Sequence, residues 1–328
     1  MSFSFTDIPR FVPAEEYQRA INNMIDRLKL LPGLISVYQV GGVTTPGISD
    51  IDLFVVFENR IKVDGNPVGN LSSNEKYLFT HKLFGTSESF VKEVEQFAFF
   101  TNYKLLFGKE LNIGSISINA EEEKIIKKQI ALEYLVKAMI TSAIENSYHS
   151  VKLRNLFLHA KALLIDLSFL GITSGKLNDV IHEIMKARSR WFEHGMNKGD
   201  VKHLAHQYHL TLNAFISELL TKEKFYLDQK SNLSISKNIL LEPSDKFSVT
   251  RDGLKIPGMI VKLHHKVPKI LNRMNRFVFH LPAQQNELPE VIENRHLFIS
   301  SMLDYQKEFL PHFIPTAYGL NIFNSNQR

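Results

Sequence analysis

The chain has 328 residues, of which 44% are hydrophobic and 22% charged, and it contains no cysteine. This composition is typical of a globular protein with a sizeable core, and it excludes a disulfide scaffold, thiolate catalysis and cysteine-type zinc sites. The net charge of +5 permits an anionic partner such as a nucleotide, and neither a signal peptide nor a span of about 20 apolar residues is evident, so we expect a cytoplasmic protein that does not bind membranes.

The amino-terminal third has the pattern of a mixed α/β domain. Apolar residues recur at helical spacing over residues 13–31. Two short apolar runs at 34–40 and 51–57 predict strands, and the Gly41-Gly42 pair between them predicts a tight turn. A polar segment follows, and the apolar run at 77–84 predicts a third strand.

The central part of the chain has helical periodicity throughout, which predicts packed helices. The expected helices are residues 121–145, 151–170, 176–192 and 201–220. The remainder is mixed. A hairpin is expected at residues 247–255 around Asp252-Gly253, a short strand at 277–280 and a final helix at 290–309.

These patterns predict an α+β protein in three parts. An α/β domain is expected over residues 1–118, a helical domain over 119–228 and a smaller mixed region over 229–328.

The stretch that carries chemistry begins at the double glycine and ends at an acidic strand. Asp50 and Asp52 are two positions apart, so a strand directs both carboxylates to one face, about 7 Å apart. Such a pair is favourable mainly around a divalent cation, and hard oxygen ligands suit Mg²⁺ or Mn²⁺. Gly41 and Gly42 leave their backbone N–H groups accessible to a phosphate. Together these features suggest a metal-bound triphosphate.

In these residues the chain resembles the DNA polymerase β-like nucleotidyltransferase superfamily. Its signature is a Gly-Gly or Gly-Ser turn after a strand, followed by an acidic-x-acidic strand, and Gly41, Gly42, Asp50 and Asp52 match it. The resemblance implies a nucleotidyltransferase-like first domain and transfer of a nucleoside monophosphate from an NTP to a hydroxyl acceptor. It also implies that Asp50 and Asp52 bind the metal, and that Gly41, Gly42 and Ser49 contact the nucleotide.

The family places a third carboxylate on a later strand, and here His81 occupies the best-phased position. We expect His81 to complete the site as a ligand or as a base. The alternatives are nearby glutamates at positions 88, 93 and 95.

The sequence is consistent with two functions. The first is a magnesium-dependent nucleotidyltransferase whose acceptor is a small molecule, an RNA or a protein. The second is a catalytically inactive nucleotide-binding or regulatory protein of the same fold, which the missing third carboxylate suggests.

Two other patterns are weaker. Arg154 and His159 resemble the Arg-x4-His ribonuclease motif of helical HEPN domains, although solvated residues beside an apolar helix face are the preferred interpretation. His203, His206 and His209 recur every three residues and so lie on successive helical turns, where they could bind zinc, although surface or packing histidines are commoner.

Overall fold

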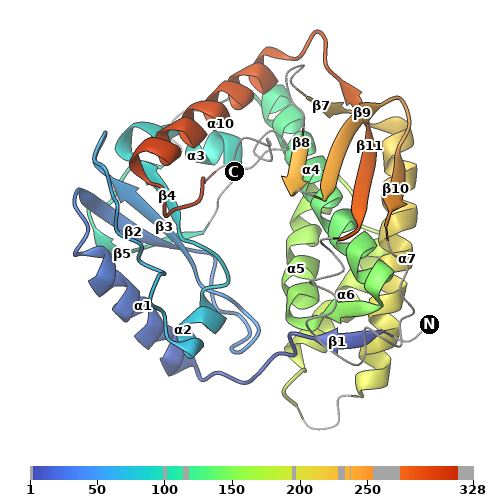
Figure 1. Ribbon diagram of the computed structural model, residues 1–328, viewed down its shortest axis with the longest axis horizontal. Coiled ribbons are helices and arrows are strands. Elements are labelled where there is room, and N and C mark those ends of the chain that lie inside the picture. Colours follow the sequence, from blue (N-terminus) through green and yellow to red (C-terminus); the bar gives the residue numbers. More distant parts are fainter. Residues whose placement is uncertain are drawn as a thin grey trace. The chain divides into compact units, whose positions relative to one another are not determined.

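The structure is a computed structural model that describes residues 3–98, 102–113, 118–193, 197–227, 233–236, 238–253 and 274–316. It divides into two compact units. Unit 1 contains the residues up to Pro9, Lys127–Ile292 and the segment from Gly319 onward, whereas unit 2 contains Arg10–Ile126 and Glu293–Tyr318. Helices and mixed sheets occur together, which confirms the α+β class (Figure 1).

Unit 2 is built on a four-stranded sheet in the order β4-β3-β2-β5. Strand β2 (Leu34–Val40) pairs antiparallel with β3 (Asp52–Phe57) on one side and with β5 (Tyr103–Gly108) on the other. Strand β4 (Phe84–Ser87) runs parallel to β3. The predicted strand at 34–40 is therefore confirmed, and the one at 51–57 begins one residue later.

The core of unit 2 lies between this sheet and helix α1 (Ala14–Leu28). The buried helix residues are at the predicted three- and four-residue spacing: Tyr17, Ala20, Ile21, Met24, Ile25 and Leu28. They cluster with alternate residues of the strands, namely Val37, Leu53, Val55 and Phe57. The helix ends three residues before the predicted boundary, since Pro32-Gly33 follows.

Helix α10 (Glu290–Phe309) returns the chain to unit 2, where Figure 1 shows it in red beside α3 (Glu88–Ala98). The ring of Phe298 lies 5.8 Å from that of Phe90 in α3. The Gln306 side chain donates a hydrogen bond to the carbonyl of Gly85, and Ile314 forms a parallel bridge with Phe84 at the sheet edge. The predicted helix at 290–309 is confirmed.

Unit 1 contains the long helices of the central region except the beginning of α4, which belongs to unit 2, and all of them were predicted with shifted ends. They are α4 (Ala120–Tyr148), α5 (Leu153–Phe169), α6 (Lys176–Ser189) and α7 (Lys198–Lys222). Two short strands, β1 (Ser4–Thr6) and β6 (Ser150–Lys152), pair in parallel.

A second sheet in unit 1 has the order β10-β11-β9-β8, with β7 on β11. Its strands are β7 (Phe225–Tyr226), β8 (Leu233–Ser236), β9 (Ile239–Ser244), β10 (Ser248–Asp252) and β11 (Arg276–Gln284). The predicted hairpin at 247–255 is wrong as a local unit, because β10 pairs with β11 from Arg276 onward. Residues 254 and 255 lie outside the described residues. The strand predicted at 277–280 is the middle of β11.

The third predicted strand, at 77–84, is also wrong. Helix α2 (Ser73–Leu78) occupies its beginning, and β4 starts only at Phe84. The helix is set by a capping box in which the Ser72 hydroxyl accepts from the N–H of Glu75, while the Glu75 carboxylate accepts from the N–H of Ser72. Residues 79–83 form the connection between helix and strand.

No helix in the described part of the chain is long and apolar enough to cross a membrane. The predicted boundaries at 118 and 228 stay predictions, because the compact units combine distant segments of the chain.

A buried polar network joins α4 and α7 in unit 1. The Ser142 hydroxyl lies 2.8 Å from Nδ1 of His209, and Nε2 of His209 lies 3.5 Å from Oε2 of Glu145. The N–H of Lys152 donates to Oε1 of Glu145. Burial raises the pKa of Glu145 to about 7 against the opposing effect of Lys152, and burial, with a further contribution from His206, lowers the pKa of His209 to about 4.

Glu145→Gln is expected to stabilise the protein by about 1–3 kcal/mol at about pH 8, with the gain vanishing at about pH 4.5. Because the folded-state pKa of Glu145 exceeds the ordinary value of 4.5, its contribution is fully present below 4.5 and is lost as the pH rises through about 7. Glutamine cannot ionise but keeps the oxygen that accepts from Lys152. Chemical denaturation at both pH values measures the difference; a constant difference would contradict the raised pKa.

Candidate metal centre

The double-glycine turn and the acidic pair lie at the same edge of the unit 2 sheet. In the antiparallel ladder Val40 is the partner of Asp52, and Gly41 directly follows Val40. The turn therefore lies beside the start of β3. The double glycine and the acidic pair, which are separated by a loop in the sequence, therefore lie close together in space.

Two tyrosines hold the loop that connects the turn to the acidic pair. The Tyr17 hydroxyl, from α1, accepts from the N–H of Gly47 at 2.8 Å and donates to the carbonyl of Ser49 at 2.7 Å. The Tyr77 hydroxyl, from α2, donates to the carbonyl of Gly47 at 2.6 Å. Side chains of α1 and α2 thus fix the position of the loop that leads into Asp50.

Ser49, predicted to contact the nucleotide, is 3% exposed. Its hydroxyl oxygen accepts a hydrogen bond of 3.1 Å from the N–H of Thr45. In this structure the side chain fastens the loop, and its contact with a nucleotide stays a prediction.

Asp50, Asp52 and His81 come together as the sequence predicted, although Asp50 precedes β3 and does not lie on the strand. One potential ligand atom from each lies within 4.8 Å of the others, and within the described residues this is the one such group of three. Nε2 of His81 lies 2.9 Å from Oδ1 of Asp52, and the two side chains are 38% and 33% exposed. The cluster is therefore open to an ion from solvent.

The hydrogen bonds of His81 define which nitrogen it presents. Nδ1 lies 2.6 Å from the carbonyl oxygen of Lys82, which can only accept, so Nδ1 carries a proton. The remaining nitrogen, Nε2, is the one that faces Asp52. A histidine whose other nitrogen donates to a carbonyl is the usual arrangement for a metal ligand.

The electrostatics of the cluster favour a cation. Burial raises the pKa of Asp50, the negative charge of Asp52 raises it further, and the hydrogen bond from Thr80 opposes the rise. Burial lowers the pKa of His81, but its hydrogen bond and attraction to Asp52 outweigh that effect, so the net pKa is raised. A divalent ion would relieve the repulsion between the carboxylates, so the residues present fit such an ion.

Thr80 is a site residue that the sequence interpretation missed. Its hydroxyl donates a hydrogen bond of 2.8 Å to Oδ2 of Asp50 and so orients that carboxylate. Both Thr80 and His81 lie in the connection before β4, not on a strand. The phasing argument for His81 was therefore wrong, although the residue itself is in the cluster.

The alternative glutamates are not part of this cluster in the described structure. Glu88 and Glu93 lie in α3, and burial raises the pKa of Glu93. The side chain at position 95 lies outside the described residues.

In the turn, the N–H of Gly41 already forms a hydrogen bond, and the space beside Gly42 could admit a ligand. Gly41 has a φ of +68°, and its N–H donates to the carbonyl of Asn102 at 3.1 Å. Gly42 does not have this left-handed backbone. A Cβ placed on either glycine would meet no described atom within 4 Å. The backbone at Gly42 is therefore open to close approach by a phosphate.

The Arg-x4-His pattern lies on α5 in unit 1. Arg154 is 3% exposed and so is largely withdrawn from solvent. Burial, with contributions from Lys137 and Lys152, lowers the pKa of His159 to about 4, so His159 is neutral near pH 7. Arg154 is therefore buried and not solvated as the preferred interpretation had it, and the geometry gives the ribonuclease interpretation no support.

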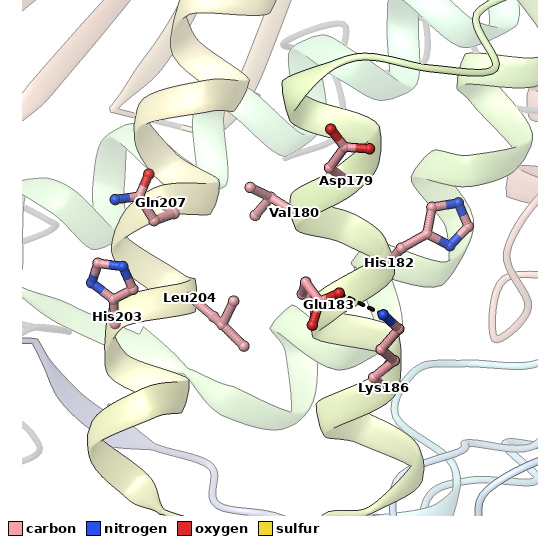
Figure 2. A pocket seen from close by; sticks show the side chains of 8 residues that line it. All are labelled: Asp179, Val180, His182, Glu183, Lys186, His203, Leu204 and Gln207. Carbon is pink, nitrogen blue, oxygen red and sulfur yellow. Dashed lines mark hydrogen bonds and ion pairs between the residues drawn. The ribbon is translucent and has the colours of Figure 1, made fainter.

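The side chains of His203, His206 and His209 on α7 lie in different environments. His209 is 1% exposed and contacts Ser142, and the ring of His206 lies 6.0 Å from that of Phe3. His203 lines a pocket of about 450 Å³ between α6 and α7, together with His182 on the opposite helix (Figure 2). Among the described residues they form no three-ligand metal group.

Comparisons of the chain with protein-family models, with curated proteins and with solved structures found no match.

Proposed function

We propose that the protein is a metal-dependent nucleotidyltransferase that transfers a nucleoside monophosphate from an NTP to a hydroxyl acceptor. The observation that carries the proposal is the gathering of Asp50, Asp52 and His81 beside the Gly41-Gly42 turn. Two carboxylates and an imidazole supply ligands for a divalent ion, while an accessible glycine backbone suits a phosphate. The resemblance to the DNA polymerase β-like superfamily supports the same reaction.

The proposed roles follow from position. Asp50 and Asp52 hold the ion, Thr80 orients Asp50, and Nε2 of His81 completes the protein ligands. A bound ion would neutralise charge on the triphosphate. The N–H of Gly42 donates to a phosphate oxygen.

The bonds exchanged are the following. The acceptor oxygen forms a bond to the α-phosphorus and releases its proton to water, and the bond from that phosphorus to the pyrophosphate oxygen breaks. The acceptor is a small molecule, an RNA or a protein.

Incubation of the full chain with each NTP, a divalent ion and a cell extract tests the proposal, with mass spectrometry of products and a pyrophosphate assay. Pyrophosphate release and an acceptor heavier by one nucleoside monophosphate are expected, and EDTA should abolish both. Absence of release with every NTP, in both Mg²⁺ and Mn²⁺, would contradict the enzyme.

A second candidate is a nucleotide-binding regulatory protein of the same fold. It is favoured by the histidine at the place where the family has its third carboxylate, since an acceptor then lacks its usual base. Calorimetry distinguishes the two: metal-dependent NTP binding without turnover, unrestored by His81→Asp, indicates the regulatory protein.

Gly42→Ala is expected to weaken NTP binding about tenfold or more, because the added methyl group blocks the approach of a phosphate to a charge-assisted hydrogen bond. The described surroundings leave room for the methyl group and the backbone is not left-handed, so the thermal unfolding midpoint should not change. Calorimetry with a non-hydrolysable NTP analogue measures the affinity. Metal binding serves as the control and should be unaffected; unchanged NTP affinity would exclude the contact.

A further inference from the structure

We infer that the centre selects a first-row transition ion, Mn²⁺, over Mg²⁺, because Nε2 of His81 is its third protein ligand. This inference rests on the metal centre of the proposed function, but it concerns the choice of ion and needs no nucleotide. It starts from the orientation of one side chain.

The ring of His81 is held from two directions. Its Nδ1 donates to the carbonyl of Lys82, and its ring meets that of Phe84 edge-on, with the centroids 5.2 Å apart. Both contacts are local, since they involve the following residue and the first residue of β4. They leave Nε2 directed at the acidic pair, 2.9 Å from Oδ1 of Asp52.

The donor set is therefore two carboxylates and one neutral nitrogen ligand. Mg²⁺ demands oxygen ligands and gives up its water reluctantly, so an imidazole adds little to its binding. Imidazole suits transition ions, whereas carboxylates suit Mg²⁺ and Mn²⁺ alike. Mn²⁺ accepts both kinds of donor, and exchanging the nitrogen for a third carboxylate would reduce the preference for Mn²⁺ over Mg²⁺.

The carboxylates are arranged consistently with this assignment. Thr80 donates to Oδ2 of Asp50 and so fixes the rotation of that group. Asp50 precedes β3, so its position is set by the loop that Tyr17 binds at Ser49. Asp52 is the first residue of β3, so its position is set by the sheet.

The test is titration of the full-length metal-free protein with Mn²⁺ and with Mg²⁺ alone, by calorimetry. Wild type should bind Mn²⁺ about a hundredfold more tightly than Mg²⁺, and His81→Asp should reduce that ratio about tenfold or more. The matched control is His182→Ala, which removes an exposed histidine on α6 and should keep the wild-type ratio. A ratio unchanged in His81→Asp would overturn the inference.

A second measurement does not depend on whether a variant folds. Pulsed electron paramagnetic resonance of Mn²⁺ bound to wild type should detect coupling to a directly ligated ¹⁴N nucleus, and this coupling should persist in His182→Ala. Stoichiometric Mn²⁺ without nitrogen coupling would overturn the inference.

The outcomes separate the inference from the proposed function. Selective Mn²⁺ binding with nitrogen coupling but no NTP turnover would support the ion assignment and contradict the enzyme. NTP turnover with equal Mn²⁺ and Mg²⁺ affinities would do the reverse.

Discussion

Asp50→Ala and Asp52→Ala are each expected to reduce NTP turnover by about a thousandfold or more. Each change removes one of the two negative charges proposed to hold the divalent ion, which would neutralise charge on the leaving pyrophosphate. Burial and the charge of Asp52 already raise the pKa of Asp50, so loss of one carboxylate also relieves repulsion in the protein without ion. Turnover should therefore fall in both variants, and in Asp50→Ala the thermal unfolding midpoint should stay equal or rise.

The matched control for these variants is Asp26→Ala. Asp26 lies on α1 of the same unit, its side chain is 72% exposed and it forms a local ion pair with Lys29 at 3.0 Å. An exposed pair of this kind contributes little, so turnover and stability should both resemble wild type. Pyrophosphate release, measured under saturating metal, decides the result. Full turnover by both site variants would refute the assignment of the metal ligands.

Gly108→Ala is expected to destabilise unit 2 by about 3 kcal/mol or more. Gly108 ends β5 with a φ of +89°, which is unfavourable for any residue with a Cβ. The new methyl group would also lie well inside van der Waals contact with the carbonyl oxygen of Ile35. Because that oxygen belongs to the neighbouring β2 backbone, relief requires movement of the sheet.

Gly41→Ala separates the two causes. Gly41 belongs to the same unit and has a φ of +68°, but a Cβ there meets no described atom within 4 Å. Gly41→Ala should therefore lower the free energy of unfolding only by the backbone strain, about 1–2 kcal/mol. Chemical denaturation of both variants gives the difference. Equal losses at the two positions would show that the contact with Ile35 does not contribute.

Local periodicity predicted the elements whose own residues determine them. The apolar stripe of α1 was visible at 13–31, and the helix at 290–309 was predicted at the ends it has in the structure. The strand at 34–40 was bounded by glycines on both sides. In these segments the hydrophobic pattern and the end signals agree, and tertiary contacts do not override them.

The segment at 77–84 was predicted incorrectly because a short apolar run suits a strand and a buried helix end equally. The sequence did contain the deciding signal, since Ser72 and Glu75 are at the spacing of a capping box. Helix α2 is only two turns long, and the run begins near its end. The same error hid Thr80, whose role depends on the connection that follows.

Pairings between distant segments were beyond local reasoning. Strand β1 pairs with β6 although Ser4 and Ser150 are far apart in the chain, and both strands are only three residues long. Strand β10 pairs with β11 across a long segment, whereas the glycine after Asp252 suggested a tight turn. Registers of this kind are determined by the burial of each strand against its neighbours.

Because α10 returns to unit 2, some of the contacts that complete this unit can form only late in synthesis. The N–H of Val63 donates to the carbonyl of Phe309, and that of Gly85 to the carbonyl of Ile314. The ribosome synthesises the first part of unit 2 and then Lys127–Ile292 before it reaches Phe309 and Ile314. Nascent chains that stop before Glu290 therefore lack the contacts with β4, which begins three residues after His81. We expect the proposed metal centre to be complete only after Glu293–Tyr318 has been synthesised, so a translation product that stops earlier should not bind the ion.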